Sequence, residues 1–306
     1  MCANVKIDAS ARLRRKTPPT RCPKIEDIRK KAPSGLSYPI NLMVGSQNAK
    51  WKSELVRPRV YTGPVPDRCF VSVGEGIAVS DPSFCFFQMA SELPLVKLIQ
   101  LGLELCGSYS LPVKDDYSPG GEAADKTMYN RPQLTNVKAL KAFSDRMTGT
   151  KGYTKVSRAL RYIADGSASP MEAILFMLLT LPYKLGGFGL PPPELNRRID
   201  IGTSAEPGSG KAYYVCDFFW PKGNVAVEYD SDYYHTGADR IAADSKKRLD
   251  LEAHGIKVLA MTGKQLRNPN DCKNLARVIA GRLGRRLQYN KSQFSITQHE
   301  LRDLLL

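Results

Sequence analysis

The sequence lacks the cysteine patterns that build disulfide frameworks or zinc sites. It has seven cysteines, an odd number, and no C-x-x-C pair. Several of them stand inside apolar runs, where a free thiol behaves as a small hydrophobic side chain. The pattern argues against a small, disulfide-stapled secreted domain and favours a reducing, cytoplasmic environment.

Long hydrophobic runs are also missing. The first residues contain no apolar stretch of the kind found in signal peptides. The longest apolar segments, residues 85–106 and 174–182, are too short or too interrupted by polar residues and proline to cross a bilayer. We therefore expect a cytoplasmic protein that does not associate with membranes.

Acidic residues are scarce relative to basic ones. The chain has 45 Lys and Arg against 30 Asp and Glu, which gives a formal net charge of +15. Residues 1–60 contain 14 of these basic residues and only 4 of the acidic ones. A charge of this size attracts polyanions, and nucleic acid is the commonest polyanionic partner. The alternative is a basic protein whose charge has no such role.

The 306 residues are enough for two domains, and the hydrophobic share of 42% is enough for a packed core. Residues 1–35 are expected to form a basic, partly ordered arm. An N-terminal α/β domain of uncertain role is expected over residues 36–165. Its expected elements are short strands at 56–61, 69–73 and 77–79, one apolar helix from Asp81-Pro82 to about 106, and helices at 134–147 and 155–163.

A second domain is predicted over residues 166–290. Its expected elements are a helix from Ser169-Pro170 to 181, strands at 213–219 and 225–229 joined by a turn, a helix at 238–253, a strand at 257–261 and a helix at 274–287. This order is typical of an α/β sandwich built on a mixed sheet. Residues 291–306 are expected to form a helical tail that begins with a Thr297–Glu300 capping box.

Three acidic residues fall on the two neighbouring strands of this domain. Glu228 and Asp230 are two residues apart and therefore project from the same face of a strand. Antiparallel pairing through the turn at 221–224 can place Asp217 beside them. Clustered carboxylates repel one another unless a cation lies between them, and hard oxygen ligands suit Mg²⁺ or Mn²⁺. The alternative is a turn aspartate beside two exposed acids on an edge strand.

The ordered set of motifs resembles the PD-(D/E)XK, or restriction-endonuclease-like, nuclease superfamily, and within it the very-short-patch-repair-like branch. The family pattern has a helix with a Glu, D-F on a strand, E-x-D-G-x-x-H, a helix with D-x-x-R, and G-x-x-V on a strand. The chain has matching residues at Glu172, Asp217-Phe, Glu228-Tyr-Asp230, His235, Asp244-x-x-x-Arg248 and Gly255-Ile-Lys-Val. The resemblance covers about residues 170–265.

The resemblance implies a role for each matched residue. Asp217 would be the central metal ligand, and Glu228 a second ligand or a base acting on water. Asp230 would support the metal site, and His235 would be a general acid or base or would contact phosphate. Glu172 would orient a water on the metal. Arg248 would hold the acids in position or contact the phosphate.

Two departures from the family pattern affect this interpretation. The general superfamily motif is E-x-K, whereas Asp230 stands at the lysine position, as it does in the very-short-patch-repair-like branch. A lysine from elsewhere, such as Lys246 or Lys247, could supply the positive charge. Ser231 replaces the usual glycine, and extra residues precede His235, so its alignment with the motif is shifted.

Two other segments of the sequence indicate what kinds of molecule the protein could bind. Residues from Tyr61 through the helix that begins at Asp81 resemble antitoxin-like proteins of abortive-infection systems. The predicted helix at 274–287 is basic on one side, which fits either a helix that binds a nucleic-acid backbone or a solvated amphipathic helix. The expected nucleic-acid contacts are Lys246, Lys247, Arg277, Arg282, Arg285 and Arg286.

The sequence thus predicts an α/β protein, α+β overall, in which a restriction-endonuclease-like mixed sheet flanked by helices follows a mixed α/β domain. The predicted function is Mg²⁺- or Mn²⁺-dependent hydrolysis of phosphodiester bonds, with DNA favoured over RNA, in a defence or toxin–antitoxin context. The alternative function is a catalytically inactive DNA-binding regulator or antitoxin on a nuclease-like scaffold. A third interpretation is a protein-interaction module that binds its partner through the N-terminal domain.

Overall fold

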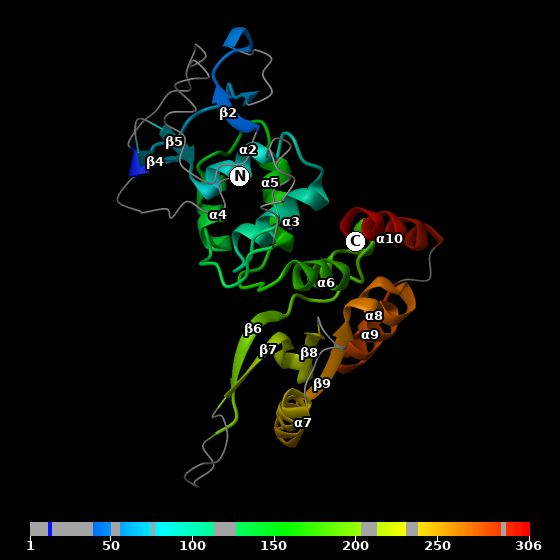
Figure 1. Cartoon of the computed structure of the whole chain (residues 1–306). Helices are drawn as coiled ribbons and strands as arrows, with labels where there is room; N and C mark the ends of the chain where they lie inside the picture. Colours follow the sequence, from blue (N-terminus) through cyan, green and yellow to red (C-terminus); the bar gives the residue numbers. More distant parts are fainter. Residues whose placement is uncertain are drawn as a thin grey trace, which may run out of the picture. The chain divides into compact units, whose positions relative to one another are not determined.

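The computed structural model describes residues 12–13, 39–49, 56–74, 77–112, 127–202, 213–230, 238–288 and 292–306. The chain divides into two compact units, Met1–Ile163 and Ala164–Leu306, which are coloured from blue to green and from green to red in Figure 1. Of the predicted basic arm, only Arg12–Leu13 falls within the described residues. In the described ranges no helix combines the length and hydropathy that crossing a membrane requires.

The first unit contains two small sheets. Strands β1 (Arg12–Leu13), β4 (Phe70–Gly74) and β5 (Ile77–Ser80) form an antiparallel sheet with β4 in the middle. Strands β2 (Ile40–Val44) and β3 (Val56–Val60) form a parallel pair. The three strands predicted in this region, β3, β4 and β5, are therefore confirmed, and β1 and β2 were not predicted.

The helices of the first unit are α2 (Pro82–Met89), α3 (Leu95–Leu105), α4 (Val137–Asp145) and α5 (Tyr153–Ala159). The predicted start of α2 is confirmed, because Asp81 caps it: its Oδ1 accepts a hydrogen bond of 3.0 Å from the Ser83 N–H. The prediction of one helix through residue 106 was wrong. The chain leaves the helix after Met89 and begins α3 after Pro94, since proline has no N–H to continue a helical ladder.

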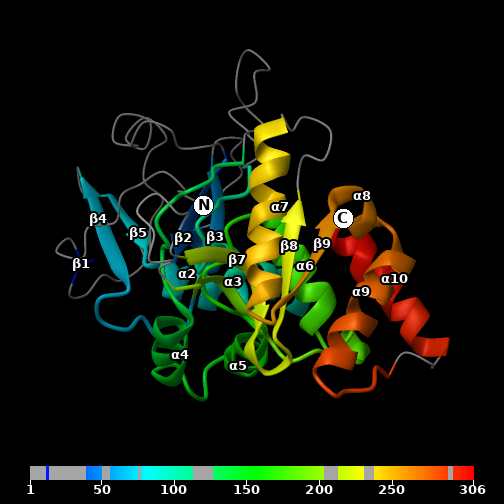
Figure 2. The same cartoon turned by 90° about the horizontal axis from the view of Figure 1, so that it is seen from below.

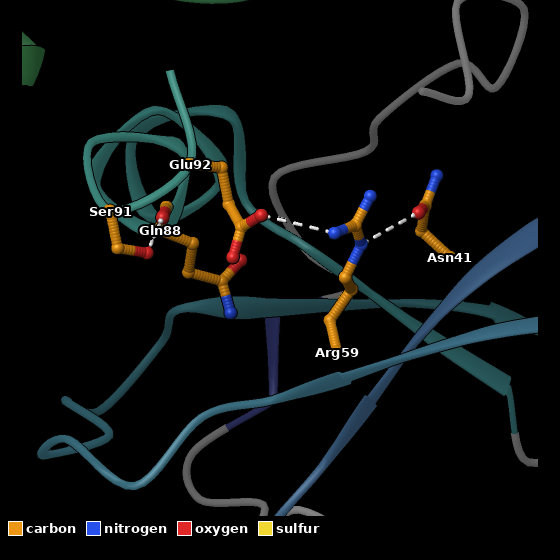
Figure 3. Close-up of polar contacts among 5 residues, drawn as sticks. All are labelled: Asn41, Arg59, Gln88, Ser91 and Glu92. Atoms are coloured by element: carbon orange, nitrogen blue, oxygen red, sulfur yellow. Dashed lines mark hydrogen bonds and ion pairs between the residues drawn. The ribbon is translucent and has the colours of Figure 1, made fainter. Parts of the chain in front are cut away.

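The first unit has an aromatic core and a polar cluster on its surface. The Phe84 ring is fully buried and meets the Tyr61 and Phe70 rings edge to face at centroid distances of 5.3 and 5.6 Å. Figure 3 shows the polar cluster, in which Arg59 of β3 forms a 3.0 Å ion pair with Glu92 and a 3.2 Å hydrogen bond to Asn41 of β2. These contacts connect the parallel strand pair to the segment that follows α2.

The second unit is built on a four-stranded mixed sheet in the order β6-β7-β8-β9. Strands β6 (Glu194–Asp200), β7 (Tyr213–Trp220) and β8 (Val225–Asp230) are antiparallel neighbours, and β9 (Lys257–Thr262) lies parallel to β8. The helices are α6 (Pro170–Thr180), α7 (Ala238–Ala253), α8 (Gly263–Arg267), α9 (Pro269–Arg282) and α10 (Ser292–Leu305). The predicted mixed α/β class is confirmed.

Three predicted features of this unit need correction. Strand β6 was not predicted, because its sequence, Glu194 to Asp200, is mostly polar and reads as a loop. Helix α9 begins at Pro269, after the capping residue Asn268, and ends at Arg282, whereas the prediction was residues 274–287. The capping box at Thr297 was wrong: Thr297 lies inside α10, and its hydroxyl donates to the carbonyls of Phe294 and Tyr183.

Helix α7 covers one face of this sheet. Leu251 is fully buried among Tyr214 and Cys216 of β7, Ala226 of β8 and Val258 of β9. Figure 2 shows α7 in yellow, running alongside β8. This packing fixes which side of α7 faces the strands that carry the predicted acids.

Candidate active site

The candidate site lies where β7 and β8 separate. The two strands pair only from Phe218 to Trp220, opposite Val227 to Val225. Beyond that point Asp217 replaces a backbone acceptor, because its Oδ2 accepts a 2.7 Å hydrogen bond from the N–H of Tyr229. The strand ends that carry Asp217 and Glu228 thus separate while remaining connected by a side chain.

Glu172 reaches the same place from the first turn of α6. The helix begins where predicted, and Ser169 caps it, with its hydroxyl accepting from the Glu172 N–H at 3.1 Å. The Glu172 side chain is buried, and its Oε2 accepts hydrogen bonds of 3.0 Å from the Ala168 N–H and from the Asn196 side-chain amide of β6. These bonds fix the orientation of the carboxylate.

Lys247 joins the site from α7. Its Nζ lies 2.9 Å from Glu228 Oε2 and donates a 2.7 Å hydrogen bond to the carbonyl of Val215. The lysine therefore bridges the two strands at the point where they no longer pair. Asp250 and Leu251 follow at i+3 and i+4 on the same helix face, and Asp250 accepts a 2.6 Å hydrogen bond from the Tyr214 hydroxyl.

The pKa values of the three acids show that their charges interact. Burial raises the pKa of Glu172 and of Glu228 above the ordinary range, and the charge of Asp217 raises both further. Burial also raises the pKa of Asp217, with Asp230 adding to the rise, while the Tyr229 N–H and Lys247 oppose it. Such mutual repulsion in a partly dry site favours a bound cation or a retained proton.

One acid is incompletely satisfied. Glu228 Oε1 is buried and meets no donor at full hydrogen-bond geometry among the described residues, although the Cys216 thiol lies close enough to lower the pKa of Glu228 as a weak donor. The neighbouring Cys216 thiol stays neutral, because burial and the charge of Glu228 raise its pKa to about 12. A buried carboxylate oxygen whose neighbouring donor is only a thiol is a position that a hard cation can fill.

The described ranges contain no group of three or more His, Cys, Asp or Glu side chains arranged as metal ligands. Asp217 and Glu228 are two carboxylates, and Mg²⁺ is commonly held by one or two carboxylates with several waters. The donor chemistry of this pair, with its incompletely satisfied Glu228 Oε1, therefore fits Mg²⁺ or Mn²⁺.

The remaining predicted site residues either lie at the edge of this site or fall outside the described residues. Asp230 ends β8, is partly exposed, and acts on Asp217 through its charge. Arg248 is exposed on α7, one residue beyond the lysine that contacts Glu228. A helix turns by about 100° per residue, so Lys247 and Arg248 point in different directions. His235 lies outside the described residues.

Five of the six predicted nucleic-acid contacts are exposed, namely Lys246, Arg277, Arg282, Arg285 and Arg286. The sixth, Lys247, is partly buried by its contacts with Glu228 and Val215. Exposure makes the five available to a polyanion, and their role as contacts stays a prediction.

Sequence reasoning missed Asn196, which fixes Glu172 from a strand that was not predicted. Its side-chain amide also donates to the carbonyl of Gly166 at 2.8 Å. Asn196 has a φ of 47°, in the left-handed region that asparagine tolerates better than most residues. An asparagine at such a position signals a backbone irregularity, but its partner across 24 residues cannot be read from the chain.

Comparison of the chain with protein-family models, with curated proteins and with solved structures finds no match in any of the three. The function of the chain is therefore inferred from the geometry of the site.

Proposed function

We propose that unit Ala164–Leu306 is a metal-dependent nuclease domain that hydrolyses phosphodiester bonds in nucleic acid, with DNA as the first substrate to test. One observation carries the proposal. Acids from α6, β7 and β8 lie close enough for their charges to interact, and Lys247 forms an ion pair with the last of them. The element order of helix, antiparallel strands, helix and parallel strand supports a restriction-endonuclease-like arrangement.

Asp217 and Glu228 would hold the Mg²⁺ or Mn²⁺ ion. A divalent ion there would neutralise charge on a scissile phosphate and lower the pKa of water. Glu172, fixed by Asn196 and the Ala168 N–H, would orient the attacking water. Lys247 would stabilise negative charge at the phosphate, the role expected of the lysine that is missing at position 230.

The first experiment compares wild type and Asp217→Ala on plasmid and single-stranded DNA with Mg²⁺ or Mn²⁺. We expect metal-dependent cleavage by wild type and a loss of at least about a hundredfold in the variant. Arg248→Ala, on the exposed side of α7, tests whether that residue contributes. The nuclease proposal fails if folded wild type binds nucleic acid but cuts none of these substrates.

A second candidate function is a DNA-binding regulator that keeps this scaffold without catalysis. The ion pair between Lys247 and Glu228 favours it, because the lysine already supplies one positive charge to the acids. The two functions differ in a measurable property. A regulator would bind DNA with an affinity that depends strongly on salt concentration. A divalent metal would change neither that affinity nor the thermal stability of the protein.

A further inference from the structure

The part of β7 that precedes Asp217 carries an exposed apolar surface. Alternate residues of a strand project to the same side, so Tyr213 and Val215 share one face, opposite the face on which Tyr214 and Cys216 pack against Leu251 of α7. Tyr213 is 39% exposed and Val215 is 41% exposed. Large apolar side chains exposed in succession beside a polar site commonly mark a binding surface.

Arg198 of β6 completes this surface. Its Cα is the register partner of Val215, and its guanidinium lies over the Tyr213 ring at 3.8 Å from the centroid. Asp200 holds the guanidinium at 2.8 Å and is the register partner of Tyr213. The aromatic ring and the cation therefore lie together on one exposed surface.

The half of β7 with this surface lies outside the β7–β8 pairing. Only Phe218 to Trp220 pair with β8. Figure 1 shows β6 and β7 running out beyond β8 and β9. Strands rise about 3.3 Å per residue, so Tyr213 is about 13 Å from Asp217 along the strand. At a rise of about 3.4 Å per nucleotide, no more than about four nucleotides of nucleic acid span that distance.

We propose that Tyr213, Val215 and Arg198 form a stacking platform for an unpaired stretch of nucleic acid leading to the carboxylates. An exposed tyrosine beside an arginine offers the π face and cation on which unpaired bases stack. Bases inside a duplex are already stacked and paired, so the platform selects single strands, overhangs or loops. The proposal depends on the proposed function only for what happens at Asp217.

The test measures binding without cleavage, using the full-length protein in EDTA. Fluorescence anisotropy would be recorded with labelled oligo(dT) and oligo(U) of about 20 nucleotides and with a DNA duplex of the same length. We expect Tyr213→Ala to weaken single-strand binding about tenfold and duplex binding less than twofold. Tyr213→Phe should bind as wild type. The two oligonucleotides show whether DNA or RNA is preferred.

Tyr129→Ala is the matched control, because Tyr129 is 60% exposed but lies in the first unit. The same substitution there should leave all affinities unchanged. Equal loss for single strands and duplex in Tyr213→Ala, or no loss at all, would overturn the platform. Circular dichroism of each variant confirms that the fold is retained.

The two proposals can fail separately. If Tyr213→Ala binds single strands normally while Asp217→Ala abolishes cleavage, the platform is refuted and the nuclease stands. If wild type never cleaves but Tyr213→Ala still loses single-strand affinity, the platform stands on a binding protein.

Discussion

The ion pair between Lys247 and Glu228 has 22% of each side chain exposed. Removing the lysine leaves a mostly buried carboxylate without its counter-charge, which costs more than a surface pair. We expect Lys247→Met to lower the free energy of unfolding by about 2 kcal/mol at pH 7, measured by urea denaturation.

Two variants make this prediction specific. Lys246→Met changes the neighbouring exposed lysine and should shift stability by no more than about 0.5 kcal/mol. Glu228→Gln combined with Lys247→Met should recover most of the loss, because no unpaired charge is left. A double variant as unstable as Lys247→Met alone would show that the lysine acts through packing rather than charge.

Asp217 gives a prediction on pH. Its pKa is raised in the folded protein, so the folded state binds a proton more readily than the unfolded state. Stability therefore falls as pH rises through the window between the ordinary and the raised pKa. Asp217→Asn lacks this titration and still accepts from the Tyr229 N–H. In EDTA at pH 7 it should be more stable than wild type by about 0.5–2 kcal/mol.

The gain should disappear as the pH falls below the ordinary aspartate pKa of about 3.9, where Asp217 is protonated in both states. Thermal unfolding of both proteins from pH 3.5 to 8 measures it. A constant difference across that range would show that the effect comes from packing or hydrogen bonding instead.

Lys247 and Leu251 lie on the same face of α7, and the Leu251 side chain packs that face against the sheet. Leu251 is fully buried, so Leu251→Ala should lower the free energy of unfolding by about 2–4 kcal/mol. Leu249 lies two residues earlier on the same helix and is 69% exposed. The same substitution there should cost less than about 0.5 kcal/mol. Urea denaturation measures both, and equal losses would contradict this packing of α7.

The sequence was most informative for elements with a clear period or a cap. Strands β7 and β8, helix α7 and the N-caps at Asp81 and Ser169 follow from alternation, helical spacing and capping residues. Strand β6 could not be predicted, because its polar side chains hide a strand whose backbone pairs with β7. Alternation of apolar and polar residues predicts a strand only when one face of that strand is buried, and β6 is largely exposed.

The candidate site was predictable only in part, for a related reason. The acids on adjacent strands follow from strand geometry, and Lys247 was one of two lysines proposed to replace the missing one. The choice between Lys246 and Lys247 depends on the rotation of α7, which Leu251 fixes by tertiary packing. The contact from Asn196 to Glu172 depends on a left-handed residue and a distant helix, and neither is encoded locally.

At the scale of the whole molecule, positive charge is concentrated near the start of the chain. Residues 1–38 contain ten basic and three acidic residues, nearly half of the net charge of +15. Binding to nucleic acid releases counterions in proportion to the number of phosphates that the protein neutralises. Each neutralised phosphate adds roughly 0.7 to 0.9 to the slope of log affinity against log salt concentration. If the protein binds nucleic acid as proposed, the N-terminal residues would contribute a salt-dependent, sequence-independent part of the affinity.

This division of charge gives a prediction for a chain that lacks residues 1–38. The logarithm of its affinity for DNA should fall less steeply with the logarithm of salt concentration, by several units of slope. Its preference for single strands over duplex at a fixed low salt should be unchanged, since that preference is assigned to Tyr213 and its neighbours. Anisotropy titrations from about 50 to 200 mM salt measure both quantities. An unchanged slope would place the polyanion-binding charge elsewhere, with the exposed arginines of α9 and the segment after it as the next residues to substitute.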